Sequence, residues 1–166
     1  MVKIKYWIIA ILAVGMGVWA AVYLFPSDVR KVKKQFNLLS EWVSKDLGEN
    51  TLTMAHKTRS LRTLFAEKFE IKTEIESMSG SYSPEEISSY AARGRLMFSY
   101  LSLSFHDLDI SFPEKGIAKV SLTARLEGRS TAGENFDETH ELECILRKIE
   151  KKWLFSNAEI VEVLKK

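Results

Sequence analysis

The chain has 166 residues, of which 46% are hydrophobic and 28% are charged, and its net charge is +2. This composition excludes a disordered chain, and the length suits one domain with one additional segment. The single cysteine, Cys144, excludes an internal disulfide framework. The sequence has no basic patch with interleaved aromatic residues, so nucleic-acid binding is not predicted.

The first 26 residues differ in kind from the rest of the chain. Residues 6–25 contain no charged or strongly polar side chain, and Lys3 and Lys5 precede them. A helix of this length covers the roughly 30 Å hydrocarbon core of a bilayer. We therefore predict a transmembrane anchor or signal-anchor over residues 1–26 and a folded domain over residues 27–166. Signal-peptidase cleavage after Ala20 is the alternative, but the apolar run continues for five residues beyond it.

Basic residues flank the predicted anchor on both sides. Arg30, Lys31, Lys33 and Lys34 outnumber the two lysines at the N-terminus, which by the positive-inside rule favours a cytoplasmic domain. The short N-terminal tail followed at once by an apolar run instead has the layout of a signal sequence. On that ground we expect a single pass through the cytoplasmic (inner) membrane, lipid contact through the N-terminal helix, and an extracytoplasmic domain. The basic run is interpreted as a solvated helix face near the membrane, with attraction to anionic lipid as the alternative.

Two helices are predicted after the anchor. Ser27 or Asp28 caps the first, in which apolar residues recur at steps of three and four: Val29, Val32, Phe36, Leu39 and Val43. Gly48 is a stop signal, and a second helix is predicted over residues 53–68. The alternation over residues 70–76 predicts a short strand.

A third helix begins with a capping box. Ser83 is the predicted N-cap, Pro84 suits the first helical position, and Glu86 follows the cap by three residues. The pattern predicts a helix to about Phe98, with Gly94 at a close packing contact.

From Leu101 onward the apolar period is two, which predicts four strands. Apolar residues occupy odd positions to Phe105 and even positions from Leu108, which predicts a β-bulge near His106 and Asp107. Two inward rows follow, and centring the loop between them pairs Ala124 with His140 and Leu122 with Leu142: Ala118, Val120, Leu122, Ala124 and Leu126, then Phe136, Glu138, His140, Leu142, Cys144 and Leu146. A turn at Glu150-Lys151 leads to a last strand headed by Trp153.

The predicted order is α-α-β-α-β-β-β-β, an α+β fold with helices on one face of the sheet. This order and the closing hairpin RKIEKKWLF resemble the nuclear transport factor 2-like superfamily, also called SnoaL-like or cystatin-like, over residues 28–163. The resemblance implies a cone of three helices on a curved, mostly antiparallel sheet, with Trp153 sealing one end. A departure is the absence of glycine at the Glu150-Lys151 turn. The superfamily contains enzymes, ligand binders and assembly modules, so the resemblance does not fix a function.

The residues that could carry chemistry are few. If the protein is an enzyme, His140 with Glu138 beside it is the candidate general base, as the resemblance places an acid or base inside the cone. Exposure of both at the tip of the sheet is the simpler interpretation. Tyr100, Asn157 and Glu159 are candidates for a cavity lining, although a second bulge would turn Asn157 and Glu159 outward. No metal-ligand spacing, phosphate loop or nucleophile motif occurs, so no metal or cofactor is predicted.

These observations favour a membrane-anchored, extracytoplasmic binding or protein-interaction module of unknown ligand, without catalytic activity. A protein partner or a second copy of the chain would be its macromolecular ligand. A small isomerase, dehydratase or hydrolase with an acid or base in the cone is the first alternative. A scaffold component of a secretion-type membrane assembly is the second alternative.

Overall fold

The computed structural model describes residues 27–73 and 79–164. The predicted anchor over residues 1–26 lies outside them, and among the described residues no helix is long and apolar enough to cross a membrane. The chain divides between Lys31 and Val32 into two units, and the architecture below is that of the second.

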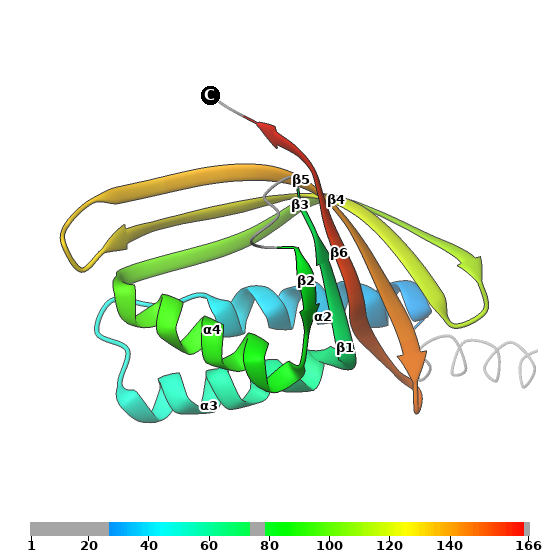
Figure 1. Ribbon diagram of the computed structural model, residues 1–166, viewed down its shortest axis with the longest axis horizontal. Helices are drawn as coiled ribbons and strands as arrows, with labels where there is room; N and C mark the ends of the chain where they lie inside the picture. Colours follow the sequence, from blue (N-terminus) through cyan, green and yellow to red (C-terminus); the bar gives the residue numbers. More distant parts are fainter. Residues whose placement is uncertain (1–26, 74–78, 165–166) are drawn as a thin grey trace, which may run out of the picture. The chain divides into compact units, whose positions relative to one another are not determined.

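Three helices and six strands make up the described fold (Figure 1). The helices are α2 (Asp28–Val43), α3 (Thr51–Leu61) with a 3-10 turn η1 (Arg62–Leu64) behind it, and α4 (Pro84–Met97). The strands are β1 (Phe65–Lys72), β2 (Gly80–Tyr82), β3 (Phe98–Glu114), β4 (Ile117–Ser130), β5 (Asn135–Ile149) and β6 (Lys152–Leu164).

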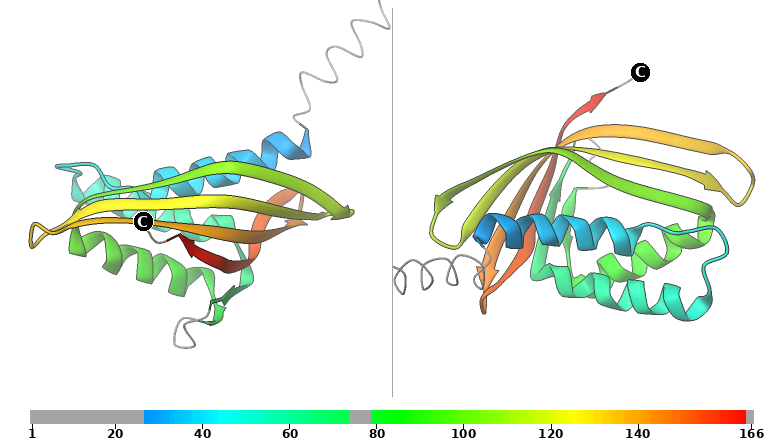
Figure 2. Two further views of the ribbon diagram at one scale, coloured as in Figure 1. Left: turned by 90° about the horizontal axis from the view of Figure 1, so that it is seen from above. Right: turned by 180° about the vertical axis from the view of Figure 1, so that it is seen from behind.

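The six strands form one curved sheet in the order β2-β1-β6-β5-β4-β3. Only β1 and β6 run parallel, and every other neighbouring pair is antiparallel. All three helices lie on the same side of this sheet, as the views in Figure 2 agree. The α+β class with helices on one face is therefore confirmed.

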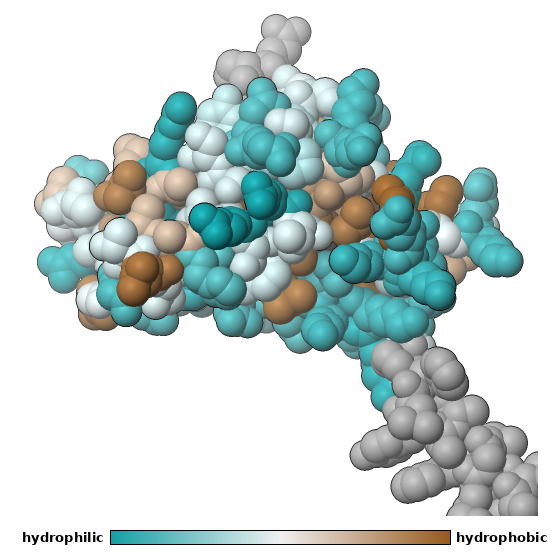
Figure 3. All heavy atoms as spheres, turned by 90° about the horizontal axis from the view of Figure 1, so that it is seen from below, coloured by the Kyte–Doolittle hydropathy of each residue, from teal (hydrophilic) through white to brown (hydrophobic). Residues whose placement is uncertain are grey.

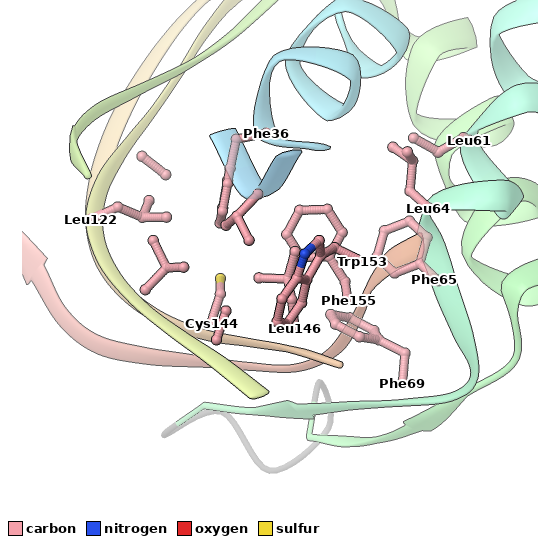
Figure 4. Packing of buried hydrophobic residues seen from close by; sticks show 14 residues of the cluster. Phe36, Leu61, Leu64, Phe65, Phe69, Leu122, Cys144, Leu146, Trp153 and Phe155 are labelled. Carbon is pink, nitrogen blue, oxygen red and sulfur yellow. The ribbon is translucent and has the colours of Figure 1, made fainter. Parts of the chain in front are cut away.

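The core fills the space between α2 and the curved strands. Phe36 of α2 meets Phe155 of β6 edge-on, with 5.0 Å between the ring centroids, and Phe105 of β3 at 5.3 Å. Leu146 and Trp153 close around the same point (Figure 4). Complete burial of one such side chain contributes about 1.5–3 kcal/mol, so the apolar stripe of α2 anchors the helical layer to the sheet.

The predicted registers of the long strands are confirmed. Ala124 pairs with His140 and Leu122 with Leu142, and the register between β3 and β4 shifts after His106. At that bulge Asp107 has a φ of 54°, the left-handed conformation that lets one extra residue enter a strand. Centring the loop predicted the pairings of β4 with β5, and the alternation of the two inward rows supported them, because a slip of one residue would turn each row to solvent.

The structure departs from the prediction at three places before β3. The second helix ends at Leu61, and residues 65–68, predicted as helix, are the start of β1. Phe65 is the parallel partner of Phe155, a pairing across ninety residues that local periodicity does not reveal. The short strand β2, opposite the end of β1, was not predicted. Nor does Gly94 mark a close contact, because a Cβ there would meet nothing within 4 Å.

The β5–β6 hairpin turns on two residues with positive φ. Glu150 has a φ of 47° and Lys151 a φ of 69°, between Ile149 and Lys152, which pair as the last rung. Both central residues of a type I′ turn need this conformation, which costs a residue with a side chain about 1–2 kcal/mol. Because neither residue of the turn is a glycine, the backbone at Glu150 and Lys151 is locally strained.

Replacing Glu150 by Asn together with Lys151→Gly should raise the free energy of unfolding by about 1 kcal/mol, because Asn-Gly suits a type I′ turn. Denaturant unfolding followed by tryptophan fluorescence measures the change. The control is Lys152→Gly in the adjacent strand, which should lower stability by about 0.5–1 kcal/mol. If the Asn-Gly pair lowered the free energy of unfolding, the inference that the native turn is strained would be wrong.

Candidate functional site

An apolar pocket lies between the helices and the β1–β2 edge of the sheet. Its volume is about 570 Å³, within the range of small-molecule sites. Every residue that lines it is aliphatic or aromatic: Leu39, Val43, Leu61, Phe65, Phe69, Ile71, Tyr82, Ile87, Tyr90 and Ala91. No carboxylate, imidazole or thiol is among these described residues, so the pocket suits an apolar body.

Local sequence patterns place these side chains. Leu39 and Val43 belong to the apolar stripe of α2, and Ile87 and Ala91 lie one helical turn apart on α4. On β1, Phe65 and Phe69 stack edge-on at 4.9 Å between centroids. The pocket wall is thus built from the same faces that form the core.

Two tyrosines supply the polar atoms of the lining. Tyr82 of β2 pairs with Phe69 of β1 in the sheet, and its ring meets Tyr90 of α4 edge-on at 5.9 Å. Tyr90 is 57% exposed, and the guanidinium of Arg93 lies 6.0 Å from its ring centroid. Tyr90 therefore stands where the pocket meets solvent, and its hydroxyl could orient a bound molecule.

A buried ion cluster fixes the helices that carry this lining. Arg95 of α4 is 1% exposed, and its Nη1 donates to three carbonyls at the end of α2, those of Trp42, Val43 and Ser44, at 2.6–2.8 Å. Its Nη2 donates to the carboxylate of Glu49, which is 3% exposed in its side chain. Because Val43 also lines the pocket, Arg95 joins two of the pocket's walls.

Lysines complete the cluster. Lys57 of α3 donates to Glu49 at 2.9 Å and to the carbonyl of Ser44 at 3.1 Å. Lys45, which follows α2, caps α4 in turn. Its Nζ donates to the carbonyls of Arg95 and Phe98 at the end of α4, at 2.9 and 2.6 Å. The cluster contains the cations Arg95, Lys57 and Lys45 but only one anion, Glu49. The C-terminal ends of α2 and α4 carry partial negative charge, which offsets the excess positive charge.

The pKa of Glu49 records this environment. Burial alone would raise it, but the hydrogen bonds from Lys57 and Arg95, and the charges of both, lower it below its usual value. The cluster was not predicted from the sequence. The signal was present in α4, where Arg95 continues the four-residue spacing of Ile87 and Ala91 on the inward face.

The predicted pair His140 and Glu138 does come together, away from the pocket. Nε2 of His140 lies 3.0 Å from Oε2 of Glu138, and the side chains are 23% and 53% exposed. Nδ1 of His140 is buried without a hydrogen-bond partner among the described residues. Neither residue borders the apolar pocket.

None of the three predicted cavity residues borders the pocket either. Tyr100 follows the alternation of β3 to the face opposite the buried Leu101. In β6 the register shifts next to Leu146, so Ala158 pairs with the inward Cys144, and Asn157 and Glu159 turn outward. Nδ2 of Asn157 then donates to Glu70 at 3.3 Å. This shift in register is the second β-bulge that the sequence left open as an alternative, and it is why Asn157 and Glu159 face outward.

The acidic pair at the bulge also lies on the outer face. Asp107 and Asp109 border a hollow of about 330 Å³ together with Glu141 and Glu143. Within the described part of the chain no group of three or more such residues is placed to hold a metal ion. Cys144 is buried, which raises the pKa of its thiol to about 12 and leaves it unreactive.

No protein-family model and no curated protein matches the chain. Solved structures match it closely in fold. A protein of Novosphingobium aromaticivorans assigned as a scytalone dehydratase is 15% identical with a TM-score of 0.65, over 83% of this chain and 85% of that chain. A hexachlorocyclohexane dehydrochlorinase, LinA type 2, is 10% identical with a TM-score of 0.62, over 83% and 88% of the two chains.

A third match is a protein of unknown function with a cystatin-like fold from Nostoc punctiforme. It is 12% identical with a TM-score of 0.61, over 86% of this chain and 95% of that chain. The chain has a cystatin-like fold. At these identities the similarity establishes the fold alone, in agreement with the resemblance to the nuclear transport factor 2-like superfamily drawn from the sequence.

Changing Glu49 to Gln should lower the free energy of unfolding by about 3 kcal/mol at pH 7, because Arg95 would remain buried without its counter-charge. The folded-state pKa of Glu49 lies below the unfolded value of about 4.3. The stabilisation is therefore complete above that value and is lost as the pH falls through the lower, folded pKa. Denaturant unfolding of both proteins between pH 7 and 3 should show the difference shrinking only below about pH 4.

The matched control is Glu41→Gln, an exposed glutamate of α2, which should change stability by less than about 0.5 kcal/mol. Combining Glu49→Leu with Arg95→Met should cost less than Glu49→Leu alone, because the single variant leaves the buried Arg95 without a counter-charge and the double variant does not. A cost for Glu49→Gln that does not vary with pH would contradict the ionic role of Glu49.

Proposed function

We propose that this protein is a membrane-anchored, extracytoplasmic binding module whose pocket holds a small apolar molecule. The observation that carries the proposal is the lining of the 570 Å³ pocket, which is aliphatic and aromatic throughout. A buried apolar surface drives binding, while two tyrosine hydroxyls can give orientation. The anchor is supported by the apolar run of residues 6–25, and the extracytoplasmic location by the short N-terminal tail before that run, which has the layout of a signal sequence.

The described lining of the pocket has no carboxylate or imidazole, the groups that most often act as general bases. A general base must lie within about 3 Å of the proton that it removes, directly or through one water. The titratable side chains that border the pocket are Tyr82 and Tyr90, and no carboxylate or imidazole stands among the described lining residues. A ligand in the pocket is thus held without a carboxylate or imidazole beside it.

The pocket can be tested with 1-naphthol, which has an apolar body and one hydroxyl. The full chain in lipid nanodiscs should bind it, as measured by calorimetry with empty nanodiscs subtracted. Ala91→Phe, which fills the pocket, should weaken binding at least about tenfold, or 1.4 kcal/mol. Ala132→Phe places the same side chain in the exposed β4–β5 turn and should leave binding unchanged. Equal affinities for the two variants would overturn the pocket as the binding site.

An enzyme is the second candidate function, and the contact of His140 with Glu138 is the observation that favours it. Such a pair could remove a proton from carbon while hydroxide or chloride leaves the adjacent carbon, as dehydration and dehydrochlorination require. Two structures of similar fold carry the names of enzymes that catalyse these reactions.

We expect no turnover of scytalone or hexachlorocyclohexane by the full chain, because His140 lies outside the pocket. Product formation followed by chromatography is the measurement, with His140→Asn as the matched variant. Turnover that is lost in His140→Asn would replace the binding proposal by the enzyme.

A further inference from the structure

Exposed basic side chains gather at one end of the second unit. The β3–β4 hairpin, the β5–β6 hairpin and the first turns of α2 after Lys31 all reach this end (Figures 1 and 2). Seven exposed basic residues lie there with three exposed acidic ones: Glu114, Glu150, and Glu67 of β1, which borders one hollow together with Arg147 and Glu150. The basic residues, named here the basic end, are Lys33, Lys34, Lys115, Arg147, Lys148, Lys151 and Lys152.

The two hairpins are held together rather than independent. The backbone N–H of Lys148 donates to the carbonyl of Gly116 at 2.8 Å, which links the end of β5 to the β3–β4 turn. Trp153, which is 2% exposed, packs against Phe112 with 5.6 Å between centroids, and Nζ of Lys148 lies 5.6 Å from the Trp153 ring. The backbone of the two hairpins that carry these basic side chains is therefore held in a fixed arrangement.

Apolar side chains are interspersed among these charges. Phe112 is 40% exposed and Ile149 is 44% exposed, and both belong to the hairpin arms that carry the lysines. Figure 3 shows mostly hydrophilic side chains at this end, on the right as in Figure 1, with hydrophobic ones between them. Basic groups with neighbouring apolar side chains are typical of surfaces that enter the headgroup region of a bilayer.

The opposite end of the sheet differs. At the β4–β5 turn the guanidinium of Arg129 lies beside Gly133, and Glu134 is the one other charged residue of residues 129–135, so the two charges balance. The excess of positive charge is thus confined to one end of the long strands. An anionic surface would meet the domain in one orientation.

We propose that the basic end docks on the anionic headgroups of the membrane that holds the chain. Lys33 follows the last residue of the apolar run, Phe25, by only eight positions, so at full extension the two lie at most about 28 Å apart. This proximity favours lipid over an acidic protein as the occupant. The inference rests on the proposed membrane anchor.

The test uses the full chain reconstituted in vesicles of phosphatidylcholine, with or without about one third phosphatidylglycerol. A fluorescent label is placed on Ser111→Cys, which is exposed near the basic end, or on Ala132→Cys in the opposite turn. Cys144 is buried and stays unlabelled. Quenching of the label by headgroup-spin-labelled lipid reports contact with the bilayer surface.

Quenching at position 111 should be several-fold stronger in anionic than in neutral vesicles and stronger than at position 132. It should fall in 1 M salt, where the Debye length shrinks to about 3 Å. Three charge reversals, Lys115→Glu, Lys151→Glu and Lys152→Glu, should abolish the lipid dependence. Three matched reversals on α3, η1 and α4 should not: Arg59→Glu, Arg62→Glu and Arg93→Glu.

The outcomes separate the two proposals. A chain that floats with neither kind of vesicle refutes the anchor and this inference with it. A chain that floats with both, but shows quenching independent of lipid charge or equal at positions 111 and 132, overturns the docking surface alone. That result would leave an acidic protein as the partner of the basic end.

Discussion

The guanidinium of Arg95 holds the helical layer in place. It caps the C-terminal carbonyls of α2 and pairs with Glu49, while Lys45 caps the end of α4 in return. This exchange is needed because α3 and α4 have little apolar surface to bury. Val32 and Phe36 of α2 are fully buried, whereas Leu61 is the one buried residue of α3 and Arg95 the one buried residue of α4. Where apolar burial is small, buried hydrogen bonds to charged groups determine helix position.

The pocket follows from this division of roles. α2 is packed tightly on the sheet through its aromatic contacts. α4 is held at its C-terminal end by Arg95 and near its N-terminal end by Ser88, whose hydroxyl donates to the carbonyl of Thr58 of α3 at 2.7 Å. Between those two ends Ile87 and Ala91 face the β1–β2 edge without filling the space, which leaves the apolar pocket. A larger side chain at Ala91 would close it.

The sequence predicted the sheet better than the helical layer. Centring the loop placed Ala124 opposite His140, and the change of period-two phase located the bulge at Asp107, because a strand cannot change its inward face without an extra residue. The start of β1 could not be predicted, since Phe65 is a strand residue only through its parallel pairing with a strand ninety residues later. The cluster of Glu49 and Arg95 was missed because the inward position of Arg95 on α4 indicates a buried charge only once its tertiary partner is known. Leu39 and Val43 of the pocket lining were predicted as apolar helix positions, but the space they border depends on how separate elements meet.

The placement of the titratable groups bears on the choice between binding and catalysis. A catalytic group must be shielded enough for its environment to tune it and must still face the ligand. In this chain the strongly buried groups are committed to structure: Glu49 and Arg95 neutralise one another, and Cys144 stays protonated in the core. The pair of His140 and Glu138 is partly open to solvent and borders no part of the apolar pocket. Shielding and access to the ligand thus fall on different residues, and this separation favours recognition over reaction.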